Sequence, residues 1–318
     1  MSLTTEITTG TTLFNLDLND LVEEAFERCG RELRTGYDFR TARRSLNLLT
    51  IEWANRGINM WTIEQGQIPL VQGQNTYDLP VDTVDLLDHV VRTGTGQNQV
   101  DINLTRISAD TYLTIPTKNA YGRPIQIWID RQSGNVDSTP TTTLSQAAGA
   151  TDTTLYVTST QNLRSQGFIN IDGETILYQN IGTANGGNAN QLLNCFRAQN
   201  GTTATSHLAG ASVYNNFLPN VNIWPTGQPG TQYTLVYWRL RRIQDAGTGV
   251  STEDIPFRFI PCMAAGLAFY ISQKLPDMDL TRVPFLKSEY EQQFQLAADE
   301  DREKAPARWV PRNMFYYR

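Results

Sequence analysis

One segment constrains this chain more than any other, because its hydrophobic period changes from helical to extended at a single glycine. The segment covers residues 40–88 and reads RTARRSLNLLTIEWANRGINMWTIEQGQIPLVQGQNTYDLPVDTVDLLD. Apolar residues recur there every three or four positions, which places them on one helical face. These residues are Phe39, Ala42, Leu46, Leu49 and Trp53. Gly57 follows where a helix ends in the left-handed conformation, which only glycine adopts without a Cβ penalty. A helix ending at Arg56 is therefore predicted.

The second half of this segment predicts β-structure. Ile63, Ile68 and Leu70 indicate a strand that runs into a turn at residues 72–74. Tyr77 follows on the returning chain, before a proline closes the segment.

The runs ARRSLNLLTIEWANRGINMWTIEQ and LVQGQNTYDLPVDTVDLLD resemble the N-terminal part of head-to-tail adaptor proteins of tailed bacteriophages. The similarity is greatest to those of short-tailed phages, where the adaptor is also called a tail accessory factor or head completion protein. The resemblance depends on the joint spacing of six residues, Trp53, Gly57, Trp61, Gly73, Tyr77 and Pro80.

This resemblance implies a structural virion protein at the head-tail junction, made in the host cytoplasm. Such adaptors form a ring, typically of twelve subunits, beneath the portal protein. They connect the capsid portal to tail, nozzle or fibre proteins and line the channel through which genomic DNA passes without specific binding. It also implies that the C-terminal segment docks on the portal. No enzymatic activity and no cofactor are expected.

Composition agrees with a globular protein that binds neither DNA nor membranes on its own. The 318 residues carry a net charge of −6, whereas affinity for phosphates requires clustered lysine and arginine. No stretch of about 18 apolar residues is present, so no membrane span is expected, and no signal peptide is recognisable. Three scattered cysteines, Cys29, Cys195 and Cys262, indicate buried thiols rather than a disulfide framework.

Periodicity predicts an α+β fold. Helices are expected at residues 17–30, 38–56, 257–275 and 281–304, and they would form a four-helix bundle from both ends of the chain. A β-framework would occupy the middle, and residues 168–178 would form a hairpin with Asp172-Gly173 at its tip. An inserted all-β sandwich or barrel is expected where charged residues become rare. The predicted division is a flexible arm (1–15), an adaptor domain (16–132 and 218–304), an inserted β-domain (133–217) and an extended docking tail (305–318).

Two groups of residues are candidates for subunit and portal contacts. The tail is too rich in aromatic residues for a segment that stays in water, and aromatic residues and arginine are enriched at interface hot spots. Its candidate portal-docking residues are Arg308, Trp309, Arg312, Phe315, Tyr316, Tyr317 and Arg318. Packing against its own domain and disorder are the alternatives. Inter-subunit ion pairs are expected from Arg40, Arg43, Arg44, Arg239, Arg241 and Arg242; a solvated charged face is the alternative.

Catalytic and metal-binding motifs are not recognisable. His89 and His207 are far apart in the sequence and no histidine-cysteine cluster has ligand spacing. Asp277 and Asp279 are better explained as a turn before the last helix. A peptidoglycan hydrolase would need a carboxylate pair, for which Glu23, Glu24, Glu289 and Glu291 are the candidates. The other alternative is a tail-fibre or baseplate-type module whose β-insertion recognises a receptor.

Overall fold

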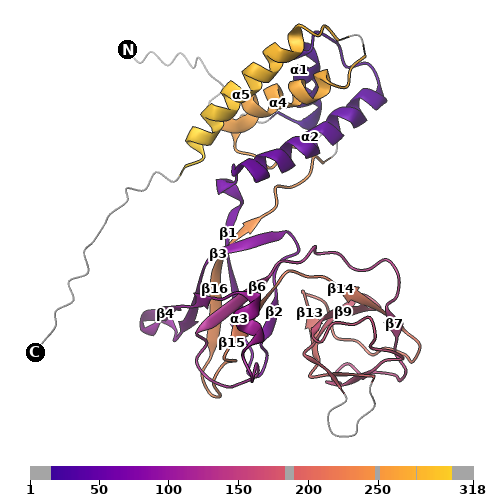
Figure 1. Cartoon of the computed structure of the whole chain (residues 1–318), viewed down its shortest axis with the longest axis vertical. Helices are drawn as coiled ribbons and strands as arrows, with labels where there is room; N and C mark the ends of the chain where they lie inside the picture. The colour runs from indigo at the N-terminus through magenta and orange to yellow at the C-terminus, as the bar shows by residue number, and fades with distance from the viewer. Residues whose placement is uncertain (1–15, 183–189, 248–250, 277, 303–318) are drawn as a thin grey trace, which may run out of the picture. The chain divides into compact units, whose positions relative to one another are not determined.

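The computed structural model describes residues 16–182, 190–247, 251–276 and 278–302, which belong to two units (Figure 1). The chain leaves the first unit between Thr62 and Ile63 and returns to it between Arg242 and Ile243. The first unit, here the helical unit, has one hydrophobic core. The second, here the β unit, has separate cores of its own.

Four α-helices and two short 3-10 helices make up the described part of the helical unit. The α-helices are α1 (Leu18–Arg28), α2 (Gly36–Arg56), α4 (Ile260–Ser272) and α5 (Arg282–Glu300), and the 3-10 helices span Met60–Thr62 and Phe257–Phe259. The four helices expected from apolar periodicity are confirmed, with ends that differ by a few residues.

Side chains that accept backbone hydrogen bonds define where α1 and α2 begin. Asp17 Oδ1 accepts from the Asp20 amide at 2.9 Å and so caps the first helix. A capping box, which sequence reasoning missed, begins α2: Thr35 Oγ1 accepts from the Asp38 amide, and Asp38 Oδ2 accepts from the Thr35 amide, both at 3.2 Å. Gly57 ends α2 with φ of 88°, which confirms the predicted left-handed cap.

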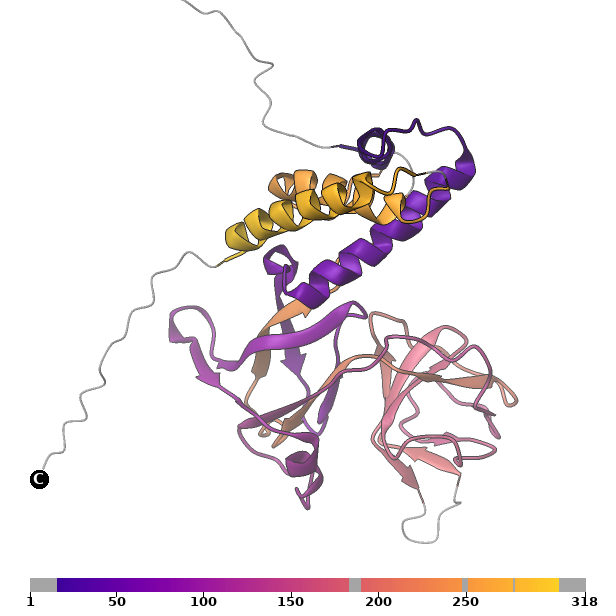
Figure 2. The same cartoon turned by 45° about the horizontal axis from the view of Figure 1, so that its top comes forward.

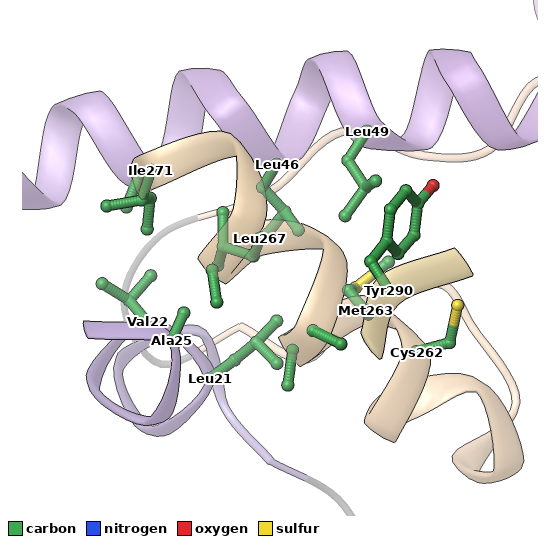
Figure 3. Close-up of a cluster of buried hydrophobic side chains, with 14 of the residues drawn as sticks. Leu21, Val22, Ala25, Leu46, Leu49, Cys262, Met263, Leu267, Ile271 and Tyr290 are labelled. Carbon is green, nitrogen blue, oxygen red and sulfur yellow. The ribbon is translucent and has the colours of Figure 1, made fainter. Parts of the chain in front are cut away.

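α4 is the central helix of this unit. Nine of its thirteen residues are buried, and α1, α2 and α5 all pack against it. Leu46 of α2 points toward α4 beside Leu267, and Leu49 lies beside Tyr290 of α5 (Figure 3). Gly266 permits this close approach, because a Cβ there would lie 2.8 Å from Cε2 of Tyr290 and 2.9 Å from Cδ1 of Leu49. A helix packed on several sides must be apolar around most of its circumference, and α4 is.

The predicted four-helix bundle formed from both ends of the chain is wrong. The described chain is mostly β-structure, with sixteen strands in four sheets against five α-helices. The helices also lack the nearly parallel alignment of a bundle, because α1 is seen end-on in Figure 2 while α2 and α5 run across the view. Periodicity identifies each amphipathic helix, but it does not reveal that one helix lies in the centre of the others.

Two four-stranded sheets of the β unit share one core. Their strand orders are β1-β16-β3-β4 and β2-β15-β6-β5. The elements are β1 (Ile63–Leu70), β2 (Thr76–Asp78), β3 (Thr83–Thr93), β4 (Val100–Asn103), β5 (Thr105–Arg106), α3 (Ala109–Leu113), β6 (Gln126–Asp130), β15 (Asn220–Trp224) and β16 (Tyr233–Arg241). Both sheets contribute apolar side chains to the core, among them Val91 and Leu235 from the first and Ile127 and Val221 from the second. β16 lies between β1 and β3, a central position that agrees with the large apolar side chains on both of its faces.

β1 and β2 belong to different sheets, although only a short turn separates them. β1 pairs antiparallel with β16, and β2 pairs antiparallel with β15. The turn is held by Tyr77, whose hydroxyl accepts from the Val71 amide at 2.8 Å and lies 3.0 Å from the carbonyl oxygens of Val71 and Gln74. The sequence predicted both strands but not the sheets that they join.

Two further sheets, of five and three strands, share another core in the β unit. Their orders are β13-β10-β9-β14-β7 and β11-β12-β8. The strands are β7 (Thr142–Thr143), β8 (Leu155–Tyr156), β9 (Gly167–Ile171), β10 (Glu174–Tyr178), β11 (Asn180–Gly182), β12 (Gln191–Leu193), β13 (Phe196–Gln199) and β14 (Ser212–Asn216). The β9–β10 hairpin is confirmed, with Asp172 and Gly173 at φ of 49° and 87° in its turn.

The units of the structure and the predicted domains have different boundaries. The prediction placed the helices in one domain with the framework sheets, whereas their core residues form separate clusters in the structure. Both sheets of the second β core lie within residues 133–217, the predicted insertion. The predicted arm (1–15) and docking tail (305–318) lie outside the described residues.

Candidate functional site

An exposed apolar face of the helical unit lies on α2. Tyr37, Leu48 and Ile51 expose 63%, 51% and 57% of their surface. At about 100° per residue, these positions lie on the side of the helix opposite to Leu46 and Trp53, which are fully buried. α2 therefore has two apolar faces, one in the core and one in solvent.

Two arginines lie on the same outward side of α2. Arg40 Nε donates to the Gly36 carbonyl at 3.3 Å, and Arg44 Nη2 donates to Thr41 Oγ1 at 3.4 Å. Neither arginine has a carboxylate partner within the described ranges of the chain. Together these side chains form the outer α2 face, defined by Tyr37, Arg40, Arg44, Leu48 and Ile51.

A groove of about 400 Å³ lies beside the outer α2 face, between Arg44 and Leu48 on one side and Lys274 on the other. Lys274 Nζ donates to Ser45 Oγ at 2.8 Å. Burial, and then the positive charge of Arg44, lower the pKa of Lys274. Asp38 also lines this groove, so cationic side chains outnumber carboxylates in its wall by two to one.

α1 presents the opposite charge. Asp20, Glu23 and Glu27 are exposed along it, and with Glu24 they line a hollow of about 380 Å³. We call these four residues the outer α1 face. The helical unit thus has an acidic face on one helix and an apolar, basic face on another, which are complementary in charge.

The second arginine cluster is engaged within the β unit. Arg239 forms ion pairs with Asp82 at 2.6 Å and with Glu64 at 2.7 Å, and Arg241 Nε binds the other oxygen of Glu64 at 2.7 Å. Arg242 Nη2 donates to the Ser133 carbonyl at 3.0 Å. The ion pairs of Arg239 and Arg241 join β16 to β1 and to the loop before β3, and the Arg242 hydrogen bond reaches the chain after β6. Their role between subunits stays a prediction.

The remaining predicted contact residues lie elsewhere in the chain. Arg43 is exposed, and its Nε donates to the Ala246 carbonyl at 3.1 Å within the helical unit. The candidate portal-docking residues, from Arg308 to Arg318, lie outside the described part of the chain. Of the predicted contact residues, only Arg40 and Arg44 lie on the outer α2 face.

The carboxylates considered for hydrolysis are mostly held in ion pairs. Arg28 binds Glu24 at 2.8 Å and Glu289 at 2.9 Å, so a guanidinium lies between them. Glu291 binds Arg56 at 2.8 Å. An arginine therefore lies beside three of the four candidate carboxylates, whereas Glu23 is exposed on α1.

His207 is a structural residue of the β unit. Its Nδ1 lies 3.0 Å from Asp172 Oδ2, and its Nε2 lies 2.9 Å from Glu174 Oε2. Arg197 also binds Glu174, at 2.8 Å. His89 is on a different sheet, in β3, and among the described residues no group of three or more potential ligands is positioned to hold a metal ion.

Asp279 belongs to the turn before α5. Its Oδ1 accepts from the Thr281 amide at 2.9 Å and from the Thr281 hydroxyl at 2.7 Å. The predicted role of this residue in a turn is therefore confirmed, whereas its sequence neighbour Asp277 lies outside the described residues.

All three cysteines are buried free thiols, as predicted. Burial raises the pKa of Cys29 to about 11, despite the nearby charge of Arg282. It raises the pKa of Cys195 and Cys262 to about 12. Thiols with such pKa values are protonated at neutral pH and are poor nucleophiles.

Sequence reasoning missed the apolar part of the outer α2 face. The signal was present, because Tyr37, Leu48 and Ile51 are spaced by whole helical turns and form a second stripe beside the core stripe. The core stripe is sufficient to predict the helix, so these three residues received no predicted role.

None of the helices in the described ranges combines the length and apolar composition needed to cross a lipid bilayer. A scan against models of known protein families found no match to this chain, and a search of curated proteins found none either.

Proposed function

We propose that this protein is a structural virion protein, a head-to-tail adaptor that forms a ring under the portal and connects it to the tail. The resemblance of residues 42–88 to such adaptors supports this proposal. The observation that carries it is the outer α2 face, because a helix of 21 residues exposes apolar side chains and two arginines without carboxylate partners in the described chain. Exposed apolar surface rimmed by polar residues marks interaction sites.

The occupant of the outer α2 face in this proposal is the outer α1 face of the neighbouring subunit. A ring built by rotation needs two different complementary surfaces on each subunit. The acidic side chains of Asp20, Glu23 and Glu27 match Arg40 and Arg44 in charge. Arg-carboxylate pairs would then surround the apolar contact made by the rest of the face.

The net charge supports the role of the ring as a channel. Each subunit carries −6, so a ring of many copies is strongly acidic. An acidic channel lining would let DNA pass without adhering, because like charges repel.

Native mass spectrometry of the full-length protein, alone and mixed with the portal ring of its phage, tests the proposal. We expect a complex that contains several copies of this chain bound to one portal ring. Deleting residues 308–318 should abolish portal association, since these residues are proposed to dock there. A trimer that does not bind the portal would contradict the adaptor function and favour a fibre or baseplate-type module.

Charge reversal tests the subunit contact separately. R40E/R44E should abolish assembly on the portal, and adding D20K/E23K/E27K should restore it, because the attraction is then re-formed with exchanged signs. L208E is the matched control for introducing a charge, since Leu208 in the β unit is 80% exposed. If the protein binds the portal and these charge reversals do not change that binding, the adaptor function is retained but the assigned contact between subunits is refuted.

A further inference from the structure

A second exposed apolar stripe of the helical unit lies on α5. Phe285 and Leu296 expose 69% and 59% of their surface, and Gln292 between them is also exposed. At about 100° per residue, these three positions lie within about 40° of one another around the helix. They point away from the side chains that α5 buries in the core. We call these three residues the outer α5 face.

The spacing of this face matches the spacing of two aromatic residues in the chain that follows α5. Phe285 and Leu296 are three helical turns apart, or about 16 Å. Trp309 and Phe315 are six residues apart, with Pro311 between them, and six residues of extended chain span about 20 Å. An extended segment that runs antiparallel to α5 therefore brings Trp309 to Leu296 and Phe315 to Phe285.

The chain is long enough to make this contact within one molecule. α5 ends at Glu300, and the next residue, Asp301, is held in place because it accepts from the amides of Asn59 and Met60 at 2.8 and 3.1 Å. The eight residues from there to Trp309 span up to about 27 Å. Leu296 lies only about 8 Å from this end of the helix, so enough chain remains to reverse direction.

The two segments also carry opposite charge. Residues 288–301 contain five acidic side chains and no lysine or arginine, whereas residues 304–318 contain four lysines and arginines and no acidic side chain. Glu291 and Asp299 remain 47% and 53% exposed, although arginines bind them at 2.8 and 2.9 Å. A carboxylate accepts several hydrogen bonds, so both can bind further cations.

We propose that residues 303–318 bind the outer α5 face of their own chain. Trp309 would pack on Leu296 and Phe315 on Phe285, which removes four apolar side chains from water. The contact accounts for aromatic residues that are unfavourable in a segment surrounded by water. It goes beyond the adaptor function because it forms in the free protein. A portal that binds the same aromatic residues has to displace it first.

Photo-cross-linking of the full-length protein, without any partner, tests the proposal. Benzoylphenylalanine replaces Phe285 in one variant and Leu296 in another, and both exposed sites tolerate the larger ring. After irradiation and trypsin digestion, the probe at position 296 should be joined to residues 309–312 and the probe at position 285 to residues 313–318, in protein of monomer mass. The same probe in place of Leu48 of α2, which is 51% exposed, is the matched control and should not join to these residues.

The rate of trypsin cleavage in the native protein gives a second readout. Trypsin cleaves after Arg308 only when the segment leaves the helix. F285S/L296S should raise this rate about tenfold, because it removes the apolar contact. L48S makes the same kind of change on α2 and should leave the rate unchanged, and both variants should keep the wild-type melting temperature.

Three results would show that the proposal is wrong. They are the absence of any cross-link to residues 303–318, cross-links that join two chains instead of one, and a wild-type cleavage rate in F285S/L296S. Neither measurement includes a portal, so neither outcome depends on the adaptor function.

Discussion

Glu174 shows how a single buried charge organises the core around the β9–β10 hairpin. The residue is 2% exposed, and it accepts from Arg197 Nε and Nη2 at 2.9 and 2.8 Å. The amides of Ala198 and Thr205 donate at 3.1 and 3.0 Å, and His207 contributes the remaining contact. Burial alone would raise the pKa of Glu174, but these donors outweigh it and lower the pKa to about 2. The carboxylate is thus fully partnered although it is buried.

Replacing this carboxylate should destabilise the β unit in a pH-dependent way. At pH 7, E174Q should lower the free energy of unfolding by about 3–5 kcal/mol, because it leaves the guanidinium of Arg197 buried without its counter-ion. The folded pKa of about 2 lies below the ordinary value of 4.5, so the stabilisation is complete above pH 4.5 and is lost as the pH falls toward 2.

Urea titrations of wild type and E174Q at a series of pH values measure this effect. The difference between the two proteins should shrink below pH 4.5. E23Q, at an exposed site on α1, should show no comparable loss. If the free energy of unfolding of E174Q is below that of the wild type by the same amount at every pH, the shape of Glu174 and not its charge accounts for its stabilising role.

The ends of α2 illustrate how local sequence controls an element. Gly36 is its first residue and Gly57 its C-cap, and neither has a neighbouring atom within 4 Å of an added Cβ. The two sites differ in backbone conformation, since Gly57 has φ of 88° whereas Gly36 is helical. The same substitution should therefore have opposite effects at the two ends.

G57A should destabilise the helical unit by about 1 kcal/mol, because alanine is strained in the left-handed region. G36A should stabilise it by about 0.5 kcal/mol, because alanine restricts the unfolded chain and fits the helix. Thermal unfolding followed by circular dichroism at 222 nm checks both. Equal shifts in the same direction would show that the backbone conformation is not the determining factor.

Elements specified by neighbouring residues could be predicted from the sequence. The cap at Asp17, the end of α2 at Gly57 and the hairpin turn at Asp172-Gly173 each depend on a few adjacent residues. The pairing of β1 with β16 could not be predicted, since it joins residues 63–70 to residues 233–240 and many other pairings satisfy the same alternation.

The same distinction between neighbouring and distant residues applies to the candidate sites. The basic part of the outer α2 face could be found as a sequence cluster, because Arg40 and Arg44 are one helical turn apart. The cavity of about 760 Å³ in the β unit could not, because residues that line it, such as Tyr112, Trp128 and Asn216, come from three separate elements. Only the folded chain brings them to one wall.

At the scale of the whole molecule, the chain has two units with separate cores, connected at two points. Unfolding should therefore proceed in two transitions rather than one. L267A removes buried side-chain volume from α4 and should destabilise the helical unit by about 2–5 kcal/mol. E174Q should shift the other transition.

Differential scanning calorimetry of the wild type and the two variants tests this independence. Each variant should move one transition and leave the other at its wild-type temperature. One cooperative transition that both variants shift together would show that the two units unfold as one.

The position of the β unit within the chain has a consequence for synthesis on the ribosome. α1 and α2 emerge first, but α4, the helix on which both pack, is made only after all of residues 63–242. At translation rates of about 5–20 residues per second this delay is on the order of 10–40 s. During that time Leu21, Leu46 and Trp53 have no partner helix and remain accessible to chaperones. The β unit, whose strands are continuous in the nascent chain, is complete before the helical unit that encloses it in sequence.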